Sequence, residues 1–127
     1  LFSKKEMAGL VNYISGGVLS QEGIHRACSI LEKFRELQPD AVIFVQGIMK
    51  VAKEKSDKDP IFNNVGIEQR NERIAALADG KNIFYLDMNE VVCDEEGNLK
   101  SSLTFDDIHL YGSKYGIWVD YLKENGI

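Results

Sequence analysis

The sequence predicts an α/β fold in which a parallel sheet lies between two layers of helices, a three-layer α/β/α sandwich. Two observations predict it. Amphipathic helical patterns alternate along the chain with short, continuously apolar runs, and such runs are typical of strands that are buried on both faces. The order helix, strand, helix, strand, helix then favours parallel strands that are joined by helical crossovers.

The first half of the chain carries two predicted strands and one predicted helix. An apolar run over 10–14 leads into a Ser-Gly-Gly sequence at 15–17, where the glycines would let the chain turn sharply. Ser20 is a suitable N-cap for a helix that Pro39 would end. Residues 41–45 predict a buried strand. Within the helix, apolar residues recur on one face, namely Ile24, Ala27, Cys28, Leu31, Phe34 and Leu37.

The second half continues the alternation and ends in a helix. Since few strands are visible for a self-sufficient parallel sheet, we expect part of the domain to be missing. In such sheets ligands bind beyond the carboxyl ends of the strands, so the loops after 14, 45 and 86 should lie near one another. The predicted elements are a polar surface loop over 50–64, a helix over 67–78 that Gly80 ends, a strand over 83–86, a tight turn at 94–98 and an amphipathic helix over 115–122.

Composition limits the class of protein. With 127 residues, the chain is expected to form a single α/β domain over 1–127. Fifteen basic and twenty acidic residues give a formal net charge of -5, which disfavours a nonspecific nucleic-acid binder. No stretch approaches the roughly 20 apolar residues of a transmembrane helix. The sequence indicates no oligomeric state.

The two cysteines, Cys28 and Cys93, are far apart and form no Cys-x-x-Cys motif, which disfavours a zinc site. We expect two free thiols, and hence favour a cytoplasmic location; a secreted location stays open if the chain lacks its natural beginning. The acidic residues at 94–96 lack the ligand spacing of a calcium loop. We therefore expect neither a metal nor an organic cofactor.

The candidate catalytic residues are Asp106 and His109, which form an Asp-x-x-His pair between the last predicted strand and the last helix. Histidine is the side chain best suited to accept and return a proton near neutral pH. A carboxylate three residues earlier can fix its tautomer if the segment forms a loop or helical turn. His109 Nε2 would then be free to activate a hydroxyl nucleophile. A capping aspartate with an incidental histidine is the alternative.

Several other residues have simpler interpretations. His25 is expected on the surface of the first helix, and Asp87 is expected to cap the loop after a strand. Tyr115 and Trp118 are expected to anchor the last helix in the core. Ser15 follows a short strand and precedes glycines, so it is formally a nucleophile candidate, although an ordinary turn serine explains it better.

From about residue 38 onward the chain resembles the C-terminal portion of the SGNH, or GDSL, hydrolases. The match covers roughly 90 residues and depends on four pieces in order, of which the last is the most specific. They are the strand at 39–45 with the following Gln46-Gly47-Ile48, the helix around Asn71, the strand ending in Phe84-Tyr85-Leu86-Asp87, and the block from Leu103 to Leu110 with the following 111–115.

This resemblance implies acyl ester hydrolysis by a Ser-His-Asp triad, with His109 as general base and Asp106 as its orienting acid. It implies a small-molecule ester substrate such as an acetylated carbohydrate, a short-chain ester or a lipid. Asp107 replaces a common glycine of the family. The Gly-Asp-Ser nucleophile block and the glycine-x-asparagine-aspartate block are absent. The chain is therefore expected to be an incomplete SGNH domain that is inactive alone, or a degenerate relative.

Two other functions stay open. A noncatalytic α/β module that binds carbohydrate or a partner protein would explain the missing nucleophile. A flavodoxin-like nucleotide binder shares the predicted architecture, but it is disfavoured because no glycine-rich phosphate loop joins a strand to a helix at the required spacing.

Overall fold

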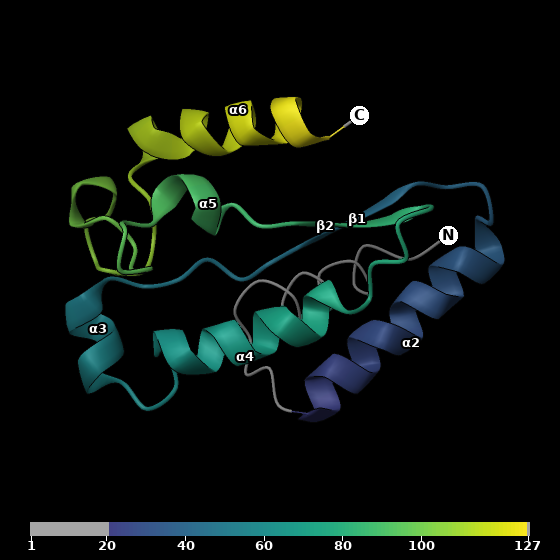
Figure 1. Ribbon diagram of the computed structural model, residues 1–127, viewed down its shortest axis with the longest axis horizontal. Helices are drawn as coiled ribbons and strands as arrows, with labels where there is room; N and C mark the ends of the chain where they lie inside the picture. Colours follow the sequence, from purple (N-terminus) through teal and green to yellow (C-terminus); the bar gives the residue numbers. More distant parts are fainter. Residues whose placement is uncertain (1–20, 127) are drawn as a thin grey trace. The chain divides into compact units, whose positions relative to one another are not determined.

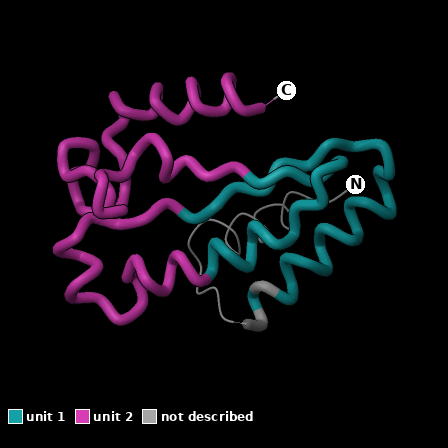
Figure 2. The backbone as a smooth tube through the Cα atoms, viewed as in Figure 1, with its two compact units in different colours: residues 1–48, 70–85 teal, residues 49–69, 86–127 magenta. Residues whose placement is uncertain are grey.

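The computed structural model describes residues 21–126 of the chain. It is a mixed α/β structure in which strands β1 (Ile43–Gln46) and β2 (Ile83–Leu86) form a two-stranded parallel sheet (Figure 1). Since helical segments separate the strands along the chain, the predicted alternation of helix and strand is confirmed at this level. The chain divides into two compact units, residues 1–48 with 70–85 and residues 49–69 with 86–127 (Figure 2).

The first unit has its core between the sheet and two helical segments. Helix α2 (Gln21–Leu37) and the second half of α4 (Asn64–Ala75) pack on one face of the sheet (Figure 1). The predicted apolar face of α2 is confirmed by Leu31, although Leu37 at its end is 45% exposed. The buried core residues come from all four elements, namely Leu31, Val45, Ile74 and Ile83.

The two predicted strands that fall within the described residues are both present, and β2 has the predicted bounds. Strand β1 begins two residues later than predicted, where the Ile43 N–H donates to the Asn82 carbonyl at 2.7 Å. On the sheet surface the rings of Phe44 and Phe84 lie 5.8 Å apart, measured between centroids. Residues 10–17 and Ser20, to which the sequence assigns a strand, a glycine turn and a helix cap, lie outside the described residues.

Helix α4 begins earlier than the apolar pattern indicates. The Asn63 Oδ1 atom accepts the Gly66 N–H at 2.8 Å, which satisfies one of the free amide groups at the helix start. Asparagine is favoured at such a position because its short side chain reaches the first turn. Apolar periodicity, which begins at Ile67, detects only the part of the helix that contacts the core.

The second unit contains an element where a surface loop was predicted. Residues 50–64 are not simply a loop, because helix α3 (Lys53–Lys58) lies within them and Val51 and Ala52 before it are buried. On α3 and at its end, lysines and aspartates four residues apart form ion pairs, Lys53–Asp57 and Lys55–Asp59, each at 2.9 Å. Such pairs give a short polar helix local support that apolar periodicity does not report.

The acidic turn at 94–98 is confirmed. The Asp94 carbonyl accepts the Gly97 N–H, and its Oδ1 accepts the N–H groups of Glu96 and Asn98, all within about 3 Å. Gly97 has φ +81°, which glycine adopts without steric cost. An antiparallel bridge between Cys93 and Leu99 closes the turn, which follows the short helix α5 (Asn89–Val92). All three charged side chains are exposed.

The last helix, α6 (Tyr115–Asn125), is present as predicted and follows the 3-10 turns η1 (Ser101–Leu103) and η2 (Gly112–Lys114). Its anchor differs from the prediction. Tyr115 is 44% exposed and Trp118 is half-buried, whereas Tyr121 is buried and its hydroxyl oxygen accepts the Asp87 N–H at 3.0 Å. The prediction that Tyr115 anchors the helix in the core is therefore wrong. No helix within the described residues is both long and apolar enough to span a membrane.

Acid should weaken the turn before β2. The Asp79 carboxylate accepts the N–H groups of Ile83, Lys81 and Asn82 at 2.9 to 3.0 Å and lies 3.3 Å from Arg35. The Ile83 N–H foremost, with the other two amides, lowers the pKa of Asp79 from 3.8 to about 2. A depressed native pKa contributes stability above about pH 4 that is lost as pH falls through about 2.

We therefore expect the urea concentration at the unfolding midpoint to fall less steeply in Asp79→Asn than in the unaltered chain as the pH is lowered from about 4 to about 2. Part of the fall should remain, because the pKa of Asp59 is also lowered to about 2 by its bonds to Lys55, Phe62 and Ile61. The exposed Asp40→Asn is the control. An Asp79→Asn profile as steep as that of the unaltered chain would contradict the assignment.

Candidate active site

The Asp-x-x-His segment is a closed loop on the second unit. An antiparallel bridge joins Thr104 to Leu110, and the Tyr111 N–H donates to the Leu103 carbonyl at 2.9 Å. Leu103, Thr104 and Leu110 are buried, whereas Asp106 and His109 at the tip are exposed. The apolar base therefore anchors the loop, and its tip presents polar side chains to solvent.

Asp106 organises the tip of this loop. Its Oδ1 atom accepts the backbone N–H of His109 at 2.7 Å and that of Ile108 at 3.0 Å. Its Oδ2 atom lies 2.6 Å from His109 Nδ1. An aspartate that accepts amide groups two and three residues ahead forms a local turn. One carboxylate thus contacts both the backbone and the imidazole of His109.

The charge state of Asp106 follows from the same contacts. The backbone N–H of His109, followed by its side chain, holds the pKa of Asp106 well below its usual range. The carboxylate is therefore ionised at neutral pH and can only accept hydrogen bonds. His109 Nδ1 must carry the proton that they share, which leaves Nε2 of the neutral ring as an acceptor.

Asp107 has a positive φ of 67°, a region that L side chains seldom adopt. Asp107 stands where the SGNH hydrolases that the sequence resembles commonly have glycine. Aspartate is among the residues that tolerate this backbone conformation best. Its carbonyl accepts the Ala52 N–H at 2.9 Å. The loop thus keeps its turn without glycine and is tied to the segment that precedes α3.

The Asp106–His109 pair has no candidate nucleophile bound to its imidazole among residues 21–126. No hydroxyl or thiol of these residues is hydrogen-bonded to the His109 ring, whose side chain is 65% exposed. Cys93 is a free thiol whose pKa is raised to about 11, foremost by burial, so it is a poor nucleophile. Ser15 lies outside the described residues.

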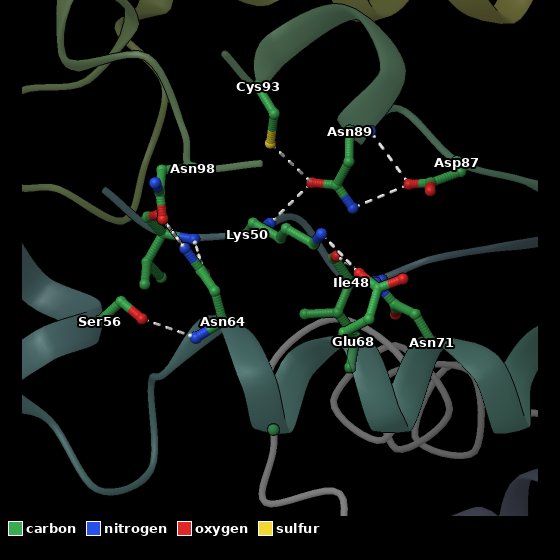
Figure 3. Close-up of polar contacts among 12 residues, drawn as sticks. Ile48, Lys50, Ser56, Asn64, Glu68, Asn71, Asp87, Asn89, Cys93 and Asn98 are labelled. Atoms are coloured by element: carbon green, nitrogen blue, oxygen red, sulfur yellow. Dashed lines mark hydrogen bonds and ion pairs between the residues drawn. The ribbon is translucent and has the colours of Figure 1, made fainter. Parts of the chain in front are cut away.

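In the first unit, Asn71 fixes the residue that ends the Gln46-Gly47-Ile48 sequence. Its buried side chain accepts the Ile48 N–H at 2.7 Å and donates to the Ile48 carbonyl at 2.9 Å (Figure 3). A Cβ at Gly47 would clash with the Tyr85 hydroxyl, so a side chain at this position would require the Tyr85 ring to move. Asn71 and Gly47 were singled out only by the resemblance, and these contacts supply their physical roles.

In the second unit, two more asparagines hold the backbone that follows. Asn89 Oδ1 accepts the Lys50 N–H at 2.8 Å, and the Asn64 side chain pairs with both the N–H and the carbonyl of Val51 at 2.9 and 2.8 Å (Figure 3). Asp87 caps the loop after β2 by accepting the Asn89 N–H and side-chain amide at 3.0 and 2.8 Å. Its predicted capping role is confirmed.

Sequence reasoning missed Asn64 and Asn89, since neither belongs to a short motif that marks backbone binding. The available signal was modest. Both are asparagines close to a helix start, and asparagine side chains at such positions commonly bind backbone groups. Lys50 was also missed. Its ammonium forms a 2.5 Å ion pair with Glu68, and its side chain is only 18% exposed.

The remaining sequence predictions concern surface residues and metals. His25 is exposed on α2, as predicted, and its carbonyl accepts the Ser29 hydroxyl at 3.1 Å. Within residues 21–126, no group of three or more His, Cys, Asp or Glu side chains is placed to hold a metal ion.

Comparisons with known proteins identify a similar fold but no family. No family model and no curated protein matches the chain. Among solved structures, it is similar to a chain from Streptococcus pneumonia described as "a putative platelet activating factor", with a TM-score of 0.74 and 22% identity over 90% of this chain. The alignment covers 55% of that chain, so this chain spans about half its length. At this identity the match shows a shared fold alone.

The positive φ of Asp107 predicts an inverted preference between glycine and alanine. Because alanine is penalised in the left-handed region, Asp107→Gly should be more stable than Asp107→Ala by about 1 kcal/mol. At the exposed Asp120 on α6, the same pair should reverse, with alanine favoured by about 1 kcal/mol. Urea unfolding of the four variants measures both differences. Alanine favoured at both positions would contradict the loop geometry.

Proposed function

We propose that the chain carries the general base and the orienting acid of a serine ester hydrolase of SGNH type. The observation that carries the proposal is the 2.6 Å contact between Asp106 Oδ2 and His109 Nδ1, on a loop whose backbone the same carboxylate fixes. An ionised acid on Nδ1 leaves Nε2 as the basic atom and stabilises the imidazolium that forms when it takes a proton.

In the proposed reaction, His109 Nε2 takes the proton from a serine hydroxyl as that oxygen attacks the carbonyl carbon of an ester. The imidazolium then returns the proton to the leaving alcohol, and an acyl-serine remains. Water attacks the acyl group in the second half, with His109 again accepting and returning a proton. The serine and the oxyanion donors belong, in this proposal, to chain outside residues 21–126.

The fold supports the proposal without deciding it. The structure has a parallel strand pair joined by a helical crossover, and such pairs are the building units of three-layer α/β/α sandwiches, the architecture expected of SGNH hydrolases. We propose that β1 and β2 belong to such a sheet. The substrate class that we propose is an acyl ester, namely an acetylated carbohydrate, a short-chain ester or a lysophospholipid, hydrolysed without a metal or organic cofactor.

A noncatalytic binding module is the second candidate. It is favoured by one observation, that no hydroxyl or thiol within residues 21–126 is hydrogen-bonded to the His109 ring. On this alternative, Asp106 would serve only to fold the exposed loop, and loss of the imidazole would cost no chemistry. The two candidates therefore differ in what a reactive-serine probe detects.

The test uses the natural full-length protein, a fluorophosphonate probe and hydrolysis of a short-chain chromogenic ester. We expect labelling of one serine, and His109→Ala should lower kcat at least about a thousandfold, as loss of a triad member does elsewhere. His25→Ala, at an exposed histidine on α2, is the matched control and should retain full turnover.

Two results would contradict the proposed enzymatic function. Near-normal turnover in His109→Ala would show that the imidazole is not the base. A natural protein that the probe does not label, and whose sequence contains no serine after a buried strand upstream, would favour the binding module.

A further inference from the structure

An exposed phenylalanine lies directly against the proposed base. Phe105 is 62% exposed, and its ring stacks on the His109 imidazole with centroids 6.4 Å apart and planes inclined by 20°. The Tyr111 ring lies 5.6 Å from the Phe105 ring, measured between centroids, with the planes inclined by 48°. Phe105 therefore has both His109 and Tyr111 as ring neighbours.

This arrangement is not explained by burial. Tyr111 is itself 43% exposed, so neither aromatic side chain fills the core. Phe105 and Tyr111 directly follow the two residues of the bridge that closes the loop, Thr104 and Leu110. The bridge therefore fixes the backbone from which both side chains extend, and Tyr111 gives the Phe105 ring a second aromatic neighbour. Offset and tilted ring pairs of this kind attract one another beyond simple area burial.

Asp106 alone leaves the imidazole incompletely fixed. Its carboxylate holds one edge of the ring at Nδ1, but a single contact permits rotation of the exposed side chain about that edge. Phe105 lies nearly parallel to the flat face of the ring. The Asp106 contact at Nδ1 and the neighbouring, nearly parallel Phe105 ring restrict different motions of the imidazole, so together they limit the direction of Nε2.

We propose that Phe105, supported by Tyr111, is a positioning residue that holds the His109 imidazole against Asp106. The positioning is a property of this chain, and only its consequence for turnover rests on the proposed function.

The first test is NMR on the full 127-residue chain. Carbon relaxation of the imidazole measures its order, and cross-relaxation between ring protons measures the stacking. We expect Phe105→Ala and Phe105→Leu to lose the contact and to raise imidazole mobility toward that of the exposed His25, which serves as an internal reference. Phe105→Tyr should restore both. Tyr115→Ala, which removes an exposed ring on α6, is the matched control and should change neither.

The second test measures turnover in the natural full-length protein. Phe105→Ala should lower kcat roughly ten- to a hundredfold with little change in KM, since a misplaced base slows the chemical step, and Phe105→Tyr should recover most of the loss. Unchanged imidazole order in Phe105→Ala would overturn the proposal. So would a loss confined to KM, because it would make Phe105 a substrate contact. Altered imidazole order in a protein without esterase activity would reject the proposed function alone.

Discussion

The candidate site depends on one ionised carboxylate that binds one residue twice. Asp106 accepts the backbone N–H of His109 through one oxygen and contacts its imidazole through the other. The backbone bond places the histidine at the right point of the loop, and the side-chain contact selects the tautomer. The backbone N–H of His109 foremost, with its side chain and the Ile108 N–H, also keeps the pKa of Asp106 low. The loop conformation and the negative charge that the proposed chemistry needs therefore have a common physical cause.

Amide side chains shape the backbone elsewhere in the chain. Asn71 holds Ile48 in the first unit, while Asn89 and Asn64 hold Lys50 and Val51 in the second. Buried backbone groups outside regular structure need partners, and an asparagine can supply a donor and an acceptor at once. This need explains why irregular backbone near strand ends can be fixed without long secondary structure.

The sequence predicted what depends on local patterns. The core face of α2 and helix α6 follow from apolar periodicity, and strands β1 and β2 follow from continuous apolar runs. The Asp106–His109 pair follows from a three-residue spacing that a turn brings together. Contacts between distant residues were not predictable in this way. Asn89 binds a residue 39 positions earlier, and α3 is supported by ion pairs rather than by an apolar face. Tyr115 and Tyr121 on α6 show that a residue type alone does not identify which aromatic ring is buried.

The tautomer of neutral His109 tests the central claim most directly. Long-range proton–nitrogen NMR correlations on the full chain distinguish a proton on Nδ1 from one on Nε2. The Asp106 contact predicts that Nδ1 carries the proton in the unaltered chain, whereas the exposed His25 should show no such enforced preference. A proton found mainly on Nε2 of His109 would show that the acid does not orient the base, and would contradict the account.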